Sequence, residues 1–331
     1  MINLAQIGVG YWGPNLLRNA VANPLCKVKT VSDLSKERQD YVKNLYPSIR
    51  VTANTDDIFN DPEIDAVIIA TPVHTHYQLA IQALQSGKHV LVEKPMATTI
   101  KEIDHIASVA KKGNLVAMVG HTFIYNSAVR YVKNLIDRGD IGEIRYIYSQ
   151  RLNLGRIRSD VDALWNFAPH DISIIQYWLD NPTPLSVTRN GIACIQPGIE
   201  DVVFLTITYP DQILAHIHVS WLDPRKMRQM VIVGSKKMIV YDDVNEDKIA
   251  IYDKGIDIHA VLGEHMDYDT QNPYLIKYRN GDLIYPQINF EEPLKVEIQH
   301  FINCIKGEEI CKSGPSEARN VIRILLNQVE T

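Results

Sequence analysis

The sequence contains few cysteines, and their spacing is irregular. Cys26, Cys194, Cys304 and Cys311 include no CxxC pair, so the spacing predicts neither a zinc site nor a disulfide framework. Cytosolic thiols stay reduced, and a chain with scattered single cysteines suits that compartment. We therefore predict a cytoplasmic protein without a metal site.

The sequence also lacks a long apolar run and an excess of positive charge. No uncharged apolar segment is long enough to cross a bilayer, and the start, MINLAQIGVG, lacks the basic and apolar regions of a signal peptide. We expect neither export nor membrane insertion. The 34 Lys and Arg residues are outnumbered by 39 Asp and Glu residues, so we expect no general attraction for nucleic acid or anionic membranes.

Short β-branched apolar runs alternate with amphipathic stretches up to residue 121. This pattern is typical of an α/β domain with a doubly wound parallel sheet and helices on both faces. The length of 331 residues leaves room for a second domain. We predict a dinucleotide-binding Rossmann domain over residues 1–121, with strands at 3–9, 28–33, 50–53, 66–72, 89–95 and 115–121.

The remaining residues, 122–331, form a predicted substrate-binding and oligomerisation domain of α+β type. Helical patterns at 128–138 and 170–179 precede consecutive alternating strands, which indicate a large, mostly antiparallel open sheet. These strands are 201–210, 213–221, 230–235, 237–243 and 248–254. Two helical stretches, 296–305 and 316–328, follow, and the last can pack back on the first domain.

The first strand leads into GVGYWG, residues 8–13, and a helical pattern follows it. In this context the first glycine permits a tight turn, the second lets the backbone approach a pyrophosphate, and the third allows close helix packing. Asp33, twenty residues beyond Gly13, is placed to bind the adenosine ribose hydroxyls and to repel a 2′-phosphate. The pattern favours NAD, while Lys36 and Arg38 leave NADP open as the less favoured cofactor.

Polar residues of the first domain gather at the carboxyl ends of the predicted strands. That edge holds the ligand crevice of a doubly wound sheet, although a single polar residue there is more often simply solvated. Together they favour a ligand site: Asp33, Thr71, His74, His76, Glu93, Lys94 and His121. The predicted cofactor contacts are Gly8, Gly10, Tyr11, Trp12, Gly13, Asp33, Thr71, Pro72, His76, Glu93 and Lys94.

Two residues are candidates for the chemistry. Lys94 ends the strand HVLVEKP, where a nicotinamide ring is expected, and its ammonium can hydrogen-bond the substrate oxygen that exchanges a proton as hydride moves. In WNFAPHDISIIQYWL, Pro169 suits the first turn of a helix, and His170 provides an acid/base group that works near neutral pH. The plainer alternatives are a solvated lysine and a histidine bonded to nearby backbone.

Four segments carry a family resemblance: GVGYWGPN, ATPVHTHYQLAIQALQSGKHVLVEKPMA, GHTFIYN and LWNFAPHDISI. They resemble the Gfo/Idh/MocA family of nicotinamide-dependent sugar and polyol dehydrogenases. The resemblance implies Lys94 as the catalytic lysine, His170 as acid/base, a cis peptide bond before Pro95, and a homodimer or homotetramer formed through the C-terminal sheet. The family often has aspartate where this chain has Asn166, and an amide can position a group but cannot relay a proton.

A narrower likeness concerns the substrate. QRLNLGRIRSD, QPGIEDVVFL and AHIHVSWLDP are similar to family members with surface-polysaccharide functions, which oxidise the 3-hydroxyl of UDP-N-acetylglucosamine or its uronate. A diphosphate needs cationic donors, and Arg151, Arg156, Arg158 and Arg225 are candidates. The predicted substrate contacts are Lys94, His121, Arg151, Asn153, Arg156, Asn166 and His170. A dehydrogenase of free aldose or inositol and a non-catalytic NAD(P)-sensing regulator remain alternatives.

Two further patterns suggest metals but are incomplete. DVNEDK, residues 243–248, begins like a calcium loop but lacks its glycine and its final glutamate, so we predict a polar turn between strands. His216 and His218 alternate on one strand face without a third ligand at useful spacing, which favours a sheet-face or interface role.

Overall fold

The computed structural model describes residues 1–260 and 274–328. They divide into two compact units. Unit 1 comprises Met1–Asn126, Ile172–Gln176 and Glu291–Gln328, and unit 2 comprises Ser127–Asp171 and Tyr177–Phe290. The first division falls after residue 126, close to the predicted boundary after residue 121, but the last two helical stretches belong to unit 1.

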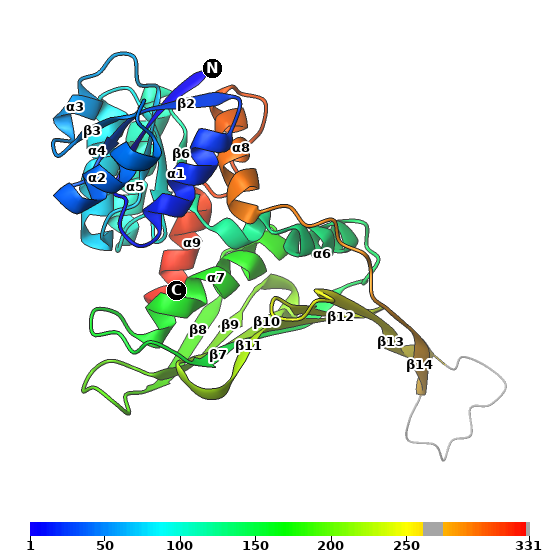
Figure 1. The fold of residues 1–331 in the computed structure, drawn as a ribbon. Coiled ribbons are helices and arrows are strands. Elements are labelled where there is room, and N and C mark those ends of the chain that lie inside the picture. The colour runs from blue at the N-terminus through cyan, green and yellow to red at the C-terminus, as the bar shows by residue number, and fades with distance from the viewer. Residues whose placement is uncertain (261–273, 329–331) are drawn as a thin grey trace. The chain divides into compact units, whose positions relative to one another are not determined.

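Unit 1 is built on a six-stranded parallel sheet with the order β3-β2-β1-β4-β5-β6, of which β2, β3 and β6 are labelled in Figure 1. This order confirms the predicted Rossmann sheet, because the chain runs outward from β1 in one direction and then outward from β4 in the other. The strands are β1 (Ile2–Ile7), β2 (Cys26–Ser32), β3 (Arg50–Thr52), β4 (Ala66–Ile69), β5 (His89–Glu93) and β6 (Ala117–Gly120). β1, β4 and β5 are buried almost throughout, as expected of strands covered on both faces.

Two groups of helices complete unit 1: α1 packs against α8, and α5 packs against α4 and α9. The helices α8 and α9 join this unit because they bury apolar residues such as Phe301 and Val321. The helices are α1 (Gly13–Ala22), α2 (Lys36–Leu45), α3 (Asp56–Phe59), α4 (His76–Gln85), α5 (Ile100–Gly113), α8 (Pro293–Ile305) and α9 (Pro315–Leu325), with short turns η1 (Val73–Thr75) and η2 (Thr122–Tyr125). A capping box between Thr99 and Glu102 begins α5.

Unit 2 contains an eight-stranded sheet with the order β14-β13-β12-β11-β7-β10-β9-β8. Among the strand pairs of this sheet in residues 144–260 and 274–284, only β7 and β10 pair in parallel, so the predicted mostly antiparallel sheet is confirmed. The elements are α6 (Ser127–Asp137), β7 (Ile144–Leu154), α7 (Ala163–Trp178), β8 (Ser186–Ile192), β9 (Val202–Thr208), η3 (Pro210–Gln212), β10 (Leu214–Ser220), β11 (Leu222–Gly234), β12 (Met238–Asp242), β13 (Ile249–Ala260) and β14 (Tyr274–Ile284). Within α7, residues Ile172–Gln176 belong to unit 1.

Three strands, β7, β8 and β14, are absent from the strands predicted from the sequence. β7 lies inside the sheet, but two of its buried positions are Ser149 and Arg151. These polar residues break the apolar alternation by which a half-buried strand is recognised.

Helix α7 begins earlier than the pattern predicts. The Trp165 amide donates to Asp162 Oδ1 at 2.8 Å and the Asn166 amide to the Asp162 carbonyl at 3.1 Å, so Asp162 caps a helix that starts at Ala163. The placement of Pro169 in the first turn is therefore wrong. Pro169 lies inside the helix, where it lacks the amide that would bond the carbonyl four residues earlier.

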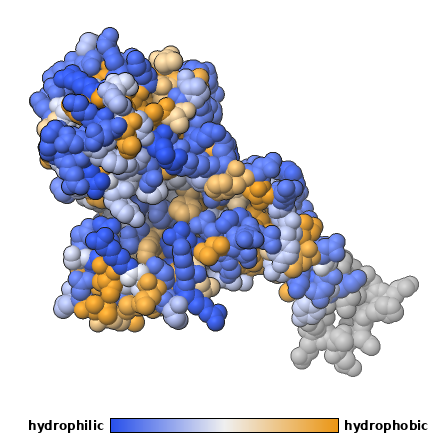
Figure 2. Space-filling view, viewed as in Figure 1, coloured by the Kyte–Doolittle hydropathy of each residue, from blue (hydrophilic) through white to orange (hydrophobic). Residues whose placement is uncertain are grey.

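Hydrophilic residues cover most of the visible surface of unit 1 (Figure 2), which agrees with the 22% of charged residues in the chain. None of the helices in the described residues is both long enough and apolar enough to span a membrane.

Candidate active site

The glycine loop between β1 and α1 is shaped by its first and third glycines. Gly8 has φ +91°, and a Cβ there would lie 2.5 Å from the Ala70 carbonyl oxygen. A Cβ at Gly13 would lie 2.5 Å from the Gly8 carbonyl oxygen. A Cβ at Gly10 would meet no atom within 4 Å among the described residues. The loop thus packs tightly at Gly8 and Gly13 and leaves open space over Gly10, which fits the approach of a pyrophosphate to the first turn of α1.

Gln6 stabilises the glycine loop through its side-chain amide, a role that the sequence patterns did not predict. Its side chain is buried in β1, and Nε2 donates to the carbonyl oxygens of Gly8 and Gly13, both at 2.8 Å. One amide group therefore ties the start of the loop to its end. The available signal was a lone glutamine in the otherwise apolar run LAQIGV.

Asp33 follows β2 and connects two loops. Oδ2 accepts a hydrogen bond from the Val9 amide at 2.8 Å, and Oδ1 accepts one from the Ser35 amide at 2.9 Å. Each carboxylate oxygen can accept a second bond, and the side chain is partly exposed. Lys36, one of the two residues that left NADP open, is paired with Asp40 at 2.8 Å. Asp33 therefore keeps capacity for ribose hydroxyls beside the glycine loop.

His76 connects the tips of β4 and β5. Nε2 lies 2.8 Å from the Thr71 carbonyl oxygen, and Nδ1 lies 2.8 Å from the Pro95 carbonyl oxygen. Burial lowers the pKa of His76, while the two carbonyl contacts act in the opposite direction. Because both ring nitrogens face protein carbonyls and the ring is buried, His76 positions the two segments. Pro72 and His74, by contrast, are exposed beside it.

The tip of β5 carries Glu93, Lys94 and Pro95, and the Lys94–Pro95 peptide bond is cis, as the family resemblance implies. The Lys94 amide donates to Glu93 Oε2 at 3.1 Å. Oε1 of Glu93 is buried and has no hydrogen-bond partner among the described residues. Burial raises the pKa of Glu93 to about 7, against the opposing effects of the Lys94 charge and amide and of a hydrogen bond from the Trp12 side chain. Tyr11, which precedes Trp12 in the glycine loop, is 94% exposed.

Carboxyl groups from α8 and α9 lie behind this tip. Thr122, just after β6, donates to Glu297 Oε2 at 3.0 Å. Burial, together with the charge of Glu93, raises the pKa of Glu297. His121 Nδ1 lies 2.6 Å from Glu317 Oε2, and both side chains are buried. His121 therefore faces the protein interior. Glu297 and Glu317 add buried carboxyl groups near the tip of β5, and the sequence patterns did not predict them.

In unit 2, Asn166 and His170 lie one turn apart on α7. Both are partly exposed, while Ala168 and Ile172 are fully buried. Residues four apart on a helix are neighbours on its surface, so the amide and the imidazole belong to one patch of α7. The structure thus brings the predicted acid/base residue His170 together with Asn166, the predicted positioning residue of this unit.

Arg151 takes a different position from that expected of a diphosphate ligand. It is buried in β7, and its Nε and Nη2 donate to the two carboxylate oxygens of Asp171 at 2.8 and 3.1 Å. This bidentate pair fastens β7 to α7, next to His170 in the chain. Arg158 pairs with Asp160. Of the remaining candidate donors, Asn153 is partly exposed, and Arg156 and Arg225 are exposed.

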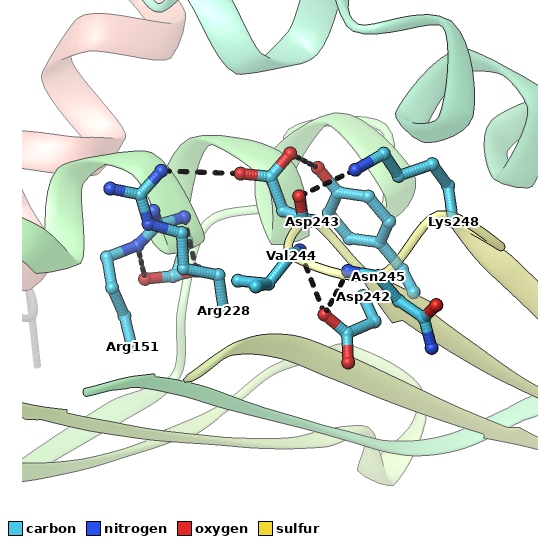
Figure 3. Close-up of polar contacts among 9 residues, drawn as sticks. Arg151, Arg228, Asp242, Asp243, Val244, Asn245 and Lys248 are labelled. Atoms are coloured by element: carbon cyan, nitrogen blue, oxygen red, sulfur yellow. Dashed lines mark hydrogen bonds and ion pairs between the residues drawn. The ribbon is translucent and has the colours of Figure 1, made fainter. Parts of the chain in front are cut away.

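The turn between β12 and β13 is a polar turn, as predicted (Figure 3). Asp242 Oδ1 accepts the amides of Val244 and Asn245, and Asp243 is bonded by Arg228 and by Tyr241. Lys248 Nζ donates to the Asp243 carbonyl at 2.8 Å. The carboxylates therefore stabilise the turn itself.

On β10, His216 and His218 stack on the Phe204 ring, with 6.2 and 4.2 Å between the ring centroids.

Comparison with known families decides the identity. Residues 2–121 match the model of the oxidoreductase family with an NAD-binding Rossmann fold, and residues 129–240 match the GFO/IDH/MocA C-terminal domain. Together the two matches cover more than half of the chain. The chain belongs to the Gfo/Idh/MocA family. It is an oxidoreductase with NAD as its cofactor, and the predicted family, fold class and cofactor are confirmed.

Three curated relatives of this Gfo/Idh/MocA protein are informative. It is 26% identical to the 2,7-anhydro-N-acetylneuraminate hydratase of Escherichia coli K12 over 89% of this chain and 82% of the relative. It is 25% identical to the scyllo-inositol 2-dehydrogenase (NAD(+)) of Bacillus subtilis over 92% and 86%. It is 28% identical to the UDP-N-acetylglucosamine 3-dehydrogenase of Acidithiobacillus ferrooxidans over 58% and 60%.

Solved structures share the fold. A crystal structure of an oxidoreductase from Magnetospirillum magnetotacticum is 27% identical and has a TM-score of 0.80, covering 98% of this chain and 99% of that chain. The fold with the two sheets described above is therefore shared with that structure.

Proposed function

We propose that this protein oxidises a secondary hydroxyl of a sugar, and that its substrate is a UDP-N-acetyl-hexosamine or its uronate, oxidised at the 3-hydroxyl. The observation that carries the proposal lies within unit 1. The glycine loop, Asp33 and the Glu93–Lys94 tip all lie at the carboxyl edge of one parallel sheet, where such folds bind their ligands. The relative from Acidithiobacillus ferrooxidans supports the choice of sugar.

The chain's own residues have distinct roles in this proposal. NAD, when bound, supplies the acceptor for the hydride that leaves the substrate carbon. Lys94 stabilises the alkoxide that develops on the substrate oxygen, and His170 takes the hydroxyl proton. Asn166 orients the histidine or the substrate, because an amide donates and accepts hydrogen bonds but carries no proton away. The Glu93 carboxylate positions the backbone of Lys94 by accepting a hydrogen bond from the Lys94 amide.

The UDP group is bound, in this proposal, by the exposed donors of unit 2. Arg156 and Asn153 are the first candidates, with Arg225 as a third. Arg151 contributes indirectly, since its buried pair with Asp171 holds the helix that carries His170. Asp33 selects NAD by accepting from the ribose hydroxyls and repelling a 2′-phosphate. A nucleotide-sugar product of this kind serves polysaccharide biosynthesis.

We also propose that two or four copies assemble through the sheet of unit 2. Its strands expose large apolar side chains, namely Tyr146, Phe204 and Leu214. Contact with a second copy would cover them.

The alternative substrate is a free polyol such as inositol, favoured by the long alignment with the Bacillus subtilis dehydrogenase. A regulator that binds NAD(P) without turnover is the remaining alternative.

The deciding experiment follows NADH absorbance with purified protein, NAD and a panel of UDP-N-acetylglucosamine, its uronate, scyllo-inositol and free aldoses. Reduction of NAD with the UDP-sugars, with a larger kcat/KM than with the polyols, supports the proposal. A larger kcat/KM with inositol would mean that the substrate is a free polyol and not a UDP-sugar. Binding of NAD without reduction by any member of the panel, measured by calorimetry, places the protein among the regulators.

A further inference from the structure

A cluster of metal-binding side chains lies in unit 1, apart from the residues assigned to catalysis. It consists of His300, Cys304 and Cys311. His300 and Cys304 are four residues apart on α8, so they share one face of the helix. Cys311 reaches them from the segment between α8 and α9. The coordinating atoms of the three residues all lie within 4.8 Å of one another.

The spacing of these atoms suits a tetrahedral ion. His300 Nε2 and Cys304 Sγ are 3.4 Å apart, and the usual zinc–nitrogen and zinc–sulfur bond lengths place such a pair about 3.6 Å apart around one zinc ion. The Sγ atoms of Cys304 and Cys311 also lie within 4.8 Å of each other. Two sulfurs and an imidazole nitrogen form a donor set that binds zinc in preference to calcium or magnesium.

The histidine is held in the orientation that a metal ligand needs. Its Nδ1 lies 2.6 Å from Glu309 Oε2, and Glu309 Oε1 in turn accepts from Asn303 Nδ2 at 2.6 Å. A carboxylate on one ring nitrogen directs the lone pair of the other toward the metal. Nε2 accepts a hydrogen bond from the Lys312 amide at 3.1 Å, so its lone pair acts as an acceptor here, and a metal ion has to displace this amide to bind it.

The cluster is enclosed but not sealed. His300 is 3% exposed and Cys304 is 8% exposed, while Cys311 is partly exposed. An ion can therefore enter beside Cys311 and keep water as its fourth ligand.

We propose that His300, Cys304 and Cys311 form a zinc site that fastens the segment after α8 to the last turns of that helix. On binding, the thiols of Cys304 and Cys311 release their protons to solvent and bind as thiolates, and the Lys312 amide gives up Nε2. The site is independent of the proposed substrate. It shares α8 with Glu297, and its role is to stabilise unit 1.

The test uses the full chain, reduced with a phosphine and freed of metal, and titrates it with Co²⁺ as a spectroscopic probe. The expected result is one equivalent bound with a thiolate-to-cobalt charge-transfer band that Zn²⁺ abolishes. Cys304→Ser and Cys311→Ser, each checked for folding by circular dichroism, should lose the band. Glu309→Gln should retain the band but bind about 10- to 100-fold more weakly.

The matched control is Cys194→Ser, which removes the exposed cysteine of unit 2 and should leave the titration unchanged. The proposal is overturned if the band survives in folded Cys304→Ser, if Cys194→Ser removes it, or if no equivalent binds. It is also overturned if Cys304 and Cys311 are joined as a disulfide in the native protein, which a mass two hydrogens lower before reduction would reveal.

Discussion

Two sets of buried charged groups, one in each unit, differ in how completely they are bonded. At the sheet edge of unit 1, buried carboxyl groups are incompletely bonded: Oε1 of Glu93 and of Glu297 has no partner among the described residues. In unit 2, the buried charge of Arg151 is matched by both oxygens of Asp171. Fully bonded charges hold elements together, whereas desolvated groups with capacity left mark places where a ligand completes the structure.

The contrast is sharpest for the cations that were candidates for substrate contact. Lys94 lies at the tip of a central strand, beside a carboxyl group whose pKa is raised to about 7 by burial. Arg151 is equally central to its sheet but is committed to a helix. Both side chains are cations on or at the tip of interior strands, so charge and position in the sheet do not by themselves predict their different roles.

Lys94→Ala tests the catalytic side of the comparison and has the largest expected effect. Loss of the ammonium removes its stabilisation of the substrate oxygen, so kcat should fall by about 10²- to 10⁴-fold, while calorimetric NAD affinity changes little. Lys111→Ala, an exposed lysine on α5, is the control and should behave as wild type. Wild-type turnover in Lys94→Ala would remove this residue from the mechanism.

Asp171→Ala tests the architectural side. Removing one partner of a buried pair leaves an uncompensated guanidinium, so the free energy of unfolding should fall by about 3–5 kcal/mol in a urea titration. Asp160→Ala, which removes the partner of the exposed Arg158, should change it by less than about 1 kcal/mol. If Arg151 instead binds the diphosphate, Arg151→Met will raise KM for a UDP-sugar and leave stability intact.

The pH dependence of stability tests whether Glu93 is desolvated. Its pKa rises from 4.5 to about 7 on folding, so the folded state binds more protons than the unfolded state in that interval. Stability should therefore fall as pH rises from 4.5 to about 7, by at most about 3 kcal/mol for this one group. Glu93→Gln should remove that part of the slope in urea titrations at several pH values, and an unchanged slope would show an ordinary, solvated carboxyl.

Local patterns predicted the parts of the fold that local rules govern. β-branched runs gave the six strands of unit 1, and the glycine loop and Asp33 were found because their spacing in the chain is fixed by one β-α-β unit. Pro169 misled the start of α7, because a proline in a helix interior looks like one in the first turn.

Contacts between distant segments could not be predicted in this way. Glu297 reaches Thr122 and Glu317 reaches His121 across 175 and 196 residues, and only packing of α8 and α9 on unit 1 creates these pairs. The same holds for Cys304 and Cys311, whose spacing matches no common motif. The catalytic roles of Lys94 and His170 stay predictions.

Gly10 and Gly13 offer the smallest but most controlled test, because the same methyl group is added at two points of one loop. At Gly13 it would lie 2.5 Å from the Gly8 carbonyl oxygen, so Gly13→Ala should lower the free energy of unfolding by about 1–3 kcal/mol. At Gly10 the methyl meets no protein atom within 4 Å among the described residues, so Gly10→Ala should unfold like wild type. It should nevertheless bind NAD more weakly, because the methyl occupies the space that the pyrophosphate needs. Calorimetry and urea titration on both variants separate the two effects, and unaltered NAD affinity in Gly10→Ala would mean that the pyrophosphate does not lie over this glycine.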